Sequence, residues 1–161
     1  MKDDRLVELL KLLASILLCQ VTGFIGSLVA GPAIPTWYAD LHKPSFAPPN
    51  WIYPLVWAAF YLLMGLALFL VWRRAGEKRV RPAVIAFVVQ LALHPVWSLA
   101  FFGLHSPLAG LVVIVLLCIA ILITISLFLR ISKAAALLLV PYVLWVSFAG
   151  VLNYSFVMLN R

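Results

Sequence analysis

Residues 108–129 read LAGLVVIVLLCIAILITISLFL, a run of 22 residues without a charged side chain. Crossing the ~30 Å hydrocarbon core of a bilayer takes about 20 helical residues, so this run is long enough to span a membrane. Four further uncharged runs have comparable lengths, at residues 12–30, 51–72, 82–103 and 134–159. None of them alternates apolar with polar residues, as the strands of a membrane β-barrel do. The sequence therefore predicts an all-α integral membrane protein, built as a five transmembrane helix bundle.

The composition of the chain excludes two other classes of protein. Its 161 residues are 66% hydrophobic and 11% charged, whereas a soluble domain is about half apolar and about a quarter charged. This excess of apolar surface excludes a soluble globular protein and a disordered one. We expect a single five-helix transmembrane domain over residues 1–161, with the proline-rich loop at residues 31–50 as a lid over one end.

The basic residues are divided unevenly between the two sides of the predicted membrane. Of the 12 Lys and Arg residues, only Lys43 and Arg161 fall on the side opposite the N-terminus. We expect a multi-pass membrane protein of the bacterial cell envelope, and in a bacterial inner membrane the positive-inside rule predicts a cytoplasmic N-terminus. Because this asymmetry accounts for the net charge of +7, the charge requires no nucleic-acid partner.

Acidic residues are missing from all five predicted spans. A carboxylate relay of the kind found in proton-coupled transporters therefore cannot be built inside the membrane. The chain also has no HExxH motif, no paired Cys/His metal set and no GxGxxG motif. We predict no metal site, and the residues leave open whether the protein is an enzyme.

Polar and aromatic residues share one face of the third predicted span. Gln90, His94, Trp97, Ser98 and Phe101 recur at helical spacing. Polar groups are costly in lipid, so this face should point into the bundle. Two interpretations remain open: these groups hold helices together by hydrogen bonds, or they line a cavity.

Aromatic stripes mark two other spans. Tyr53, Trp57 and Tyr61 form one on the second span, and Trp145 and Phe148 begin another on the fifth. Such stripes serve packing in many membrane proteins. They would equally suit a flat apolar ligand that a few polar groups orient.

The loop between the first two spans carries a specific resemblance. Residues 37–49 read WYADLHKPSFAPP, and further matching motifs include Trp57, Trp97-Ser98, Pro141-Tyr142 and Leu152-Asn153-Tyr154. In these motifs and their spacing the chain resembles the translocator protein / tryptophan-rich sensory protein family, also called the peripheral-type benzodiazepine receptor family. The resemblance implies five transmembrane helices, which agrees with the count made from the spans.

The resemblance also implies a function. Members of this family bind porphyrins such as protoporphyrin IX, sterols and benzodiazepine-type drugs, and they occur as dimers in mitochondrial outer membranes or bacterial envelopes. We therefore expect a membrane protein that binds porphyrin-type planar ligands in tetrapyrrole sensing, transport or regulation. Two alternatives stay open: light-dependent porphyrin degradation, in which Trp51 and Trp145 would act, and binding or transport of sterol or other lipid.

The expected partners follow from the same resemblance. They are porphyrin, membrane lipid and a second copy of the chain, and the motif Ser27xxxGly31 fits close helix approach in a homodimer. No cofactor is required, and protoporphyrin IX or haem is the expected ligand. Lys43, the one base in the lid, is a candidate partner for porphyrin carboxylates.

A ligand-binding set can be named by combining the polar face, the aromatic residues and the resemblance. Trp51 and Trp145 look like the stacking tryptophans of the family, and Phe46, Phe148 and Ala149 look like pocket walls. His94 stands where the family usually has Asn, and an imidazole can hydrogen-bond a ligand or ligate a haem iron. The complete set is Trp37, Phe46, Trp51, Gln90, His94, Trp97, Trp145, Phe148 and Ala149.

Overall fold

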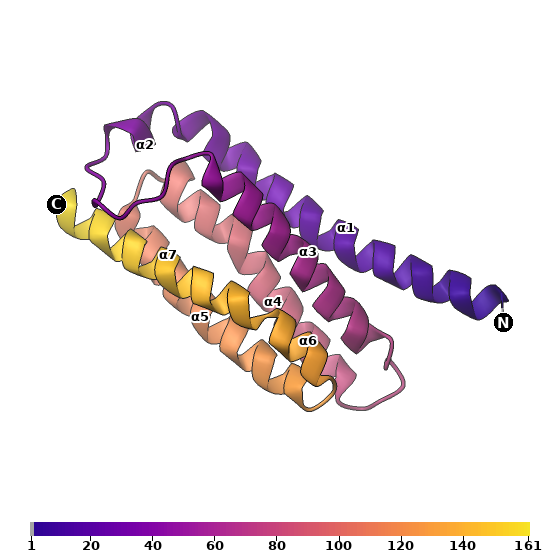
Figure 1. Ribbon diagram of the computed structural model, residues 1–161. Helices are drawn as coiled ribbons and strands as arrows, with labels where there is room; N and C mark the ends of the chain where they lie inside the picture. Colours follow the sequence, from indigo (N-terminus) through magenta and orange to yellow (C-terminus); the bar gives the residue numbers. More distant parts are fainter. Residues whose placement is uncertain (1) are drawn as a thin grey trace.

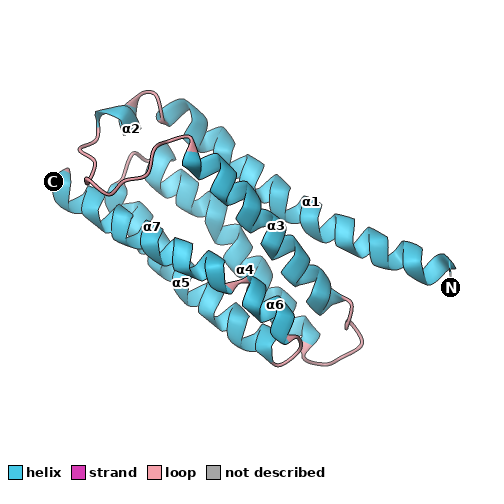
Figure 2. Cartoon of the chain, in the orientation of Figure 1, coloured by secondary structure: helices cyan, strands magenta, loops and turns pink. Residues whose placement is uncertain are grey.

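The computed structural model describes residues 2–161, with side chains from Asp4 onward, and the regular elements of this part are helices (Figures 1 and 2). Within it, five helical stretches are long and apolar enough to cross a membrane, which confirms the predicted count. The elements are α1 (Lys2–Ala33), α2 (Trp37–Asp40), α3 (Ile52–Trp72), α4 (Val80–Ser98), the π-helical turn η1 (Leu99–Gly103), α5 (Pro107–Leu129), α6 (Lys133–Leu138) and α7 (Val140–Leu159).

The first helix is longer at both ends than the predicted span of residues 12–30. It begins at Lys2 and ends at Ala33, so its N-terminal turns extend past the neighbouring helices (Figure 1). Charged side chains are excluded from hydrocarbon but are compatible with helix, and here they pair with one another. Glu8 contacts Lys11 at 3.5 Å and Arg73 at 2.6 Å. The absence of charge therefore located the apolar part of α1 but not its ends.

Two of the other spans are interrupted near a proline. The third span changes from α4 to η1 at Leu99, one turn after Pro95, whose missing N–H disturbs the hydrogen-bond ladder. The fifth span is divided at Leu139 into α6 and α7, and Pro141 stands in the first turn of α7. Proline is tolerated in a first turn because the N–H there has no helical partner.

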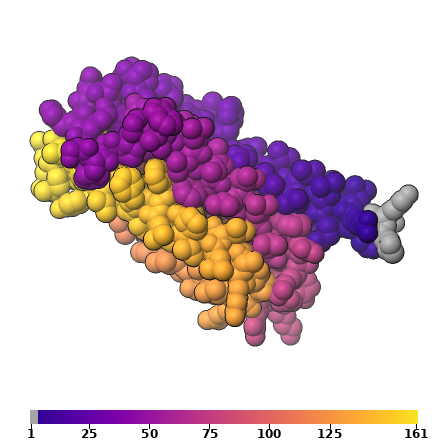
Figure 3. Space-filling model, viewed as in Figure 1, coloured from indigo at the N-terminus to yellow at the C-terminus, as the bar shows by residue number. Residues whose placement is uncertain are grey.

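The bundle has two different ends (Figures 1 and 2). At one end lie the α3–α4 loop and the α5–α6 turn, which carry the basic residues of the 73–81 and 130–133 segments. At the other end lie α2 and the C-terminus, where the 31–50 segment packs beside the end of α7 (Figure 3). The predicted separation of charge between the two ends is therefore a property of the fold.

The buried side chains form two clusters that follow this division. The larger cluster joins α3, α4, α5, α6 and α7, with Phe87 and Phe128 stacked at 5.8 Å between ring centroids. The smaller one is aromatic and lies at the lid end, where Tyr38 packs against Phe101 and Phe156. Tyr38 thereby anchors α2 to the bundle.

Helix α1 packs against α3 through a glycine. An added Cβ at Gly65 would lie 2.7 Å from the backbone Cα of Ile16. Backbone cannot move aside as a flexible side chain can, so α1 would have to shift away from α3.

Gly65→Ala should therefore lower the free energy of unfolding by about 1–3 kcal/mol, the usual cost of overpacking. The measurement is thermal unfolding of the purified protein in detergent. Gly76→Ala is the control, because an added Cβ at this loop position meets no neighbouring side chain or backbone within 4 Å. Equal melting temperatures for the two variants would contradict the close approach of α1 to α3.

Candidate functional site

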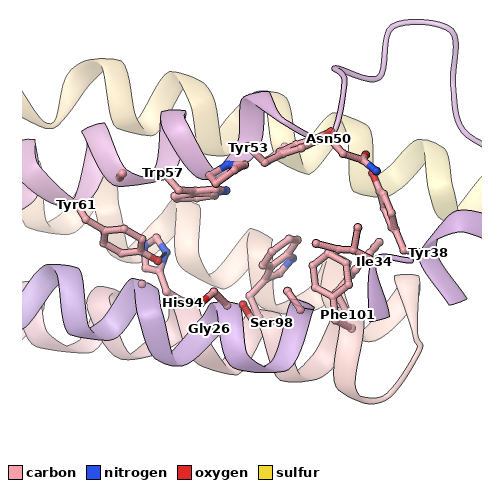
Figure 4. A pocket seen from close by; sticks show the side chains of 18 of the residues that line it. Gly26, Ile34, Tyr38, Asn50, Tyr53, Trp57, Tyr61, His94, Ser98 and Phe101 are labelled. Atoms are coloured by element: carbon pink, nitrogen blue, oxygen red, sulfur yellow. Dashed lines mark hydrogen bonds between the residues drawn. The ribbon is translucent and has the colours of Figure 1, made fainter. Parts of the chain in front are cut away.

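A cavity of about 480 Å³ lies inside the lid end of the bundle. Residues of α1, α3, α4, η1 and α7 form its walls, and Tyr38 of α2 with Asn50 closes the end under the 31–50 segment (Figure 4). Its wall is mostly apolar and aromatic. This volume and lining are typical of a site for a small organic molecule.

Side chains from different helices, most of them aromatic, face one another across the cavity. Tyr53 and Trp57 of α3 lie on one side, and Ser98 and Phe101 lie on the other (Figure 4). Trp97 is held in place from two directions: its ring stacks on Phe101 at 5.5 Å, and its Nε1–H donates to Asn153 Oδ1 at 3.2 Å. The wall is therefore a fixed surface.

Glycines of α1 make room for this arrangement. A Cβ at Gly23 would overlap the ring of Tyr61, and a Cβ at Gly26 would lie 2.9 Å from Ser98 Oγ. Glycine at these two positions lets Tyr61 and Ser98 reach the α1 side of the cavity. The small residues of α1 thus shape the cavity within one chain.

A chain of hydrogen bonds forms the deep end of the cavity and links α3, α4 and α7. His94 Nδ1 lies 3.1 Å from the Tyr61 hydroxyl, and His94 Nε2 lies 2.5 Å from the Tyr142 hydroxyl. Tyr142 donates to Gln90 Oε1 at 2.7 Å, and Gln90 Nε2 contacts Met64 Sδ at 3.7 Å. All of these side chains are buried.

The direction of this chain follows from counting protons. Tyr142 has one hydroxyl proton, which it gives to Gln90, so its oxygen must accept from His94 Nε2–H. The uncharged runs at residues 12–30, 51–72, 82–103, 108–129 and 134–159 hold no carboxylate to balance an imidazolium, so His94 is neutral and its Nδ1 accepts from Tyr61. We assign the Nε2–H tautomer on this network. Both ring nitrogens of His94 are then in use.

The structure brings together four residues of the sequence-based ligand set at the cavity wall: His94, Trp97, Trp145 and Ala149. Gln90 lies one helical turn deeper than His94. It accepts a hydrogen bond from Tyr142, which in turn bonds His94 at the cavity wall.

The remaining four residues of that set lie outside the lining. Trp37 packs on Phe101 and on His105, and Phe46 packs on Phe148 at 6.2 Å. Trp51, at the start of α3, is 67% exposed. Their roles in ligand binding remain predictions.

Other cavity residues were missed by the sequence analysis as ligand contacts. Tyr38 lies in α2 and Phe156 in α7, so they are far apart in the sequence and no local spacing connects them. Asn153 of the cavity wall, and Tyr142, which bonds His94 from outside the lining, belonged to motifs of the resemblance, which was a usable signal. Burial raises the pKa of Tyr38, which lies outside the spans, so its hydroxyl remains protonated.

An indole N–H in the cavity wall has no hydrogen-bond partner within the part of the chain that the structure describes. Trp145 Nε1 is buried and makes no hydrogen bond. A buried N–H without an acceptor costs about 1–3 kcal/mol, which an acceptor on a bound molecule would recover.

Comparison with known proteins agrees with this architecture. The sequence profile of the TspO/MBR family matches residues 15–159, which include every residue of the cavity wall. The chain belongs to the TspO/MBR family. The chain is a multi-pass membrane protein, as its five apolar helices and this membership show together.

The TspO/MBR relatives span nearly the whole chain. "Tryptophan-rich protein TspO" of Chlorobaculum tepidum is 46% identical over 95% of this chain and 98% of its own. A protein of the same name from Archaeoglobus fulgidus is 43% identical over 96% and 99%. Human "Translocator protein" is 39% identical over 81% of this chain and 79% of its own.

The hydrogen-bond chain predicts a difference between two variants that each remove one hydroxyl. Tyr142→Phe leaves both His94 Nε2–H and Gln90 Oε1 without a hydrogen-bond partner, whereas Tyr61→Phe leaves only His94 Nδ1 without one. With about 1–3 kcal/mol for each stranded group, Tyr142→Phe should lower the free energy of unfolding more. Thermal unfolding in detergent measures both, and equal losses would contradict the bonding of Tyr142 to two partners and of Tyr61 to one.

Proposed function

We propose that the cavity binds a planar, largely apolar ligand of the porphyrin type, such as protoporphyrin IX. The observation that carries this proposal is the aromatic cavity itself. Its volume is about 480 Å³, and its wall includes Trp57, Trp97 and Trp145. Aromatic side chains attract flat π-systems through stacked and edge-to-face contacts. Membership of the TspO/MBR family and the names of its relatives support a sensory or transport role in the membrane.

Polar groups in the cavity would orient such a ligand. The unpartnered Trp145 Nε1–H is available to an acceptor, and the Tyr61 oxygen is available to a donor at the deep end. Lys43 lies at the rim, with its Nζ 4.8 Å from the centroid of the Tyr38 ring. We propose that Lys43 pairs with a porphyrin carboxylate while the macrocycle lies between the aromatic walls.

His94 supports recognition of the macrocycle rather than of a metal at its centre. Both of its ring nitrogens have hydrogen-bond partners. Axial ligation of a haem iron would have to break one of these bonds and strand a buried tyrosine hydroxyl. The proposal is therefore for a metal-free porphyrin.

We also propose an orientation for the chain in the membrane. The basic end of the bundle carries the loops at residues 73–81 and 130–133, and the positive-inside rule assigns it to the cytoplasm. The N-terminus then lies in the cytoplasm, and the lid end with its cavity lies toward the outer side of a bacterial envelope membrane.

Titration with protoporphyrin IX in the dark tests the ligand. Quenching of the protein's own tryptophan fluorescence should saturate at one porphyrin per chain or per dimer. Trp145→Phe removes a wall indole and its N–H, and should weaken binding about three- to tenfold.

Trp72→Phe is the matched control for this titration. Trp72 ends α3 at the opposite end of the bundle, so its replacement should leave the affinity unchanged. Trp51→Phe, measured in the same series, tests the role that the resemblance gives to this exposed indole. Linear quenching without saturation, or equal losses in Trp145→Phe and Trp72→Phe, would refute binding in the cavity.

The lid offers a separate prediction. Asn160, just after α7, holds both backbone groups of His42: its Oδ1 accepts from the His42 N–H at 2.9 Å, and its Nδ2 donates to the His42 carbonyl at 3.1 Å. Asn160→Ala should speed amide hydrogen exchange in residues 38–48 about tenfold, because two hydrogen bonds are lost. Arg161→Ala is the control, and unchanged exchange in Asn160→Ala would contradict this attachment.

A further inference from the structure

A second hollow lies at the basic end of the bundle, at the opposite end from the aromatic cavity. It has a volume of about 370 Å³ and is bounded by Arg79, Pro82, Leu127 and Arg130. These residues belong to the start of α4 and the end of α5. We propose that this hollow binds the phosphodiester headgroup of an anionic phospholipid.

The charge of the hollow supports an anionic ligand. Its two polar walls are arginines, and the ion pairs found among residues 4–161 include neither of them. The nearby acids are already engaged: Glu8 pairs with Arg73, and Glu77 pairs with Arg74. A guanidinium matches a phosphate through two parallel hydrogen bonds. The N-terminus of α4 and the C-terminus of α5 both lie here, so their opposite dipole ends offset each other and the two arginines supply the positive charge.

The apolar walls indicate a lipid rather than a free anion. Pro82 and Leu127 belong to the first turn of α4 and the last turn of α5, at the boundary between apolar span and basic loop. A headgroup held by the two arginines would place its glycerol and first acyl carbons along this boundary. Basic hollows between transmembrane helices at this depth are typical headgroup sites.

The hollow rests on a rigid base. Arg74 Nη1 donates to the carbonyl of Ile131 at 2.5 Å and thereby ties the α3–α4 loop to the α5–α6 turn. Val80 and Ile131, which neighbour the two arginines in sequence, are buried in the larger core. The backbone segments that carry the two exposed arginines therefore have a fixed separation.

The test uses the purified full chain in an uncharged detergent. Dioctanoyl phosphatidylglycerol is titrated, with dioctanoyl phosphatidylcholine and inorganic phosphate in parallel, and bound lipid is counted by native mass spectrometry. Phosphatidylglycerol should bind saturably at one molecule per chain. Phosphatidylcholine, whose headgroup has no net charge, should bind at least tenfold more weakly. Inorganic phosphate should also be weaker, because it lacks the chains that contact Pro82 and Leu127.

The variant pair separates the hollow from the general basic surface. Arg79→Gln with Arg130→Gln should weaken binding of phosphatidylglycerol about 25-fold, from about fivefold for each basic side chain. Lys78→Gln with Lys133→Gln removes the same charge from the same two loops, at exposed positions outside the hollow, and should cause a much smaller loss.

Three outcomes would overturn the proposal. They are equal losses in the two double variants, equal binding of phosphatidylcholine, and binding of inorganic phosphate as tight as that of the lipid. An unchanged protoporphyrin IX titration or an unchanged melting temperature in both double variants shows that they are folded. Because the hollow lies at the other end of the bundle, this result is independent of the ligand proposed for the cavity.

Discussion

Lipid offers no hydrogen-bond partner, so each polar group that the helices carry into the membrane must be satisfied by another part of the chain. The side chains of Tyr61, His94, Tyr142 and Gln90 meet this constraint together. They join α3, α4 and α7 at one depth, and each bond requires its helix to face inward at a particular rotation. These rotations also determine which side chains face the cavity, among them Trp57 and Trp145.

The same constraint explains why His94 fits a position within an apolar span. A neutral imidazole is at once a donor and an acceptor, so it can continue a chain of hydroxyl groups in one direction. A lone polar side chain here would be costly, whereas a series of side chains whose hydrogen bonds are all made adds specificity to the packing of helices. His94 therefore has a structural role and also forms part of the cavity. The two interpretations of the polar face that the sequence left open are both features of the structure.

The two ends of the bundle differ in chemistry and in what they can bind. The lid end is aromatic, and Tyr38 and Phe156 line the cavity for which an apolar ligand is proposed. The basic end has a hollow lined by two arginines and two apolar residues, which suits a charged headgroup. Both properties arise from one division of the sequence: charges collect in the loops of one side, and prolines and aromatics collect in the loop of the other.

The sequence by itself determined the number of spans, the helical class and the sidedness of charge, because these depend on length and hydropathy along a single helix. It also identified His94 and Trp97 as inward-facing, since periodicity reveals a face. Periodicity does not reveal which faces meet. The pairing of His94 with both tyrosines, the entry of Tyr38 into the wall and the position of Trp51 outside it depend on contacts between residues far apart in the chain. Only the tertiary structure could supply these, because they follow from the rotation and depth at which five helices pack together.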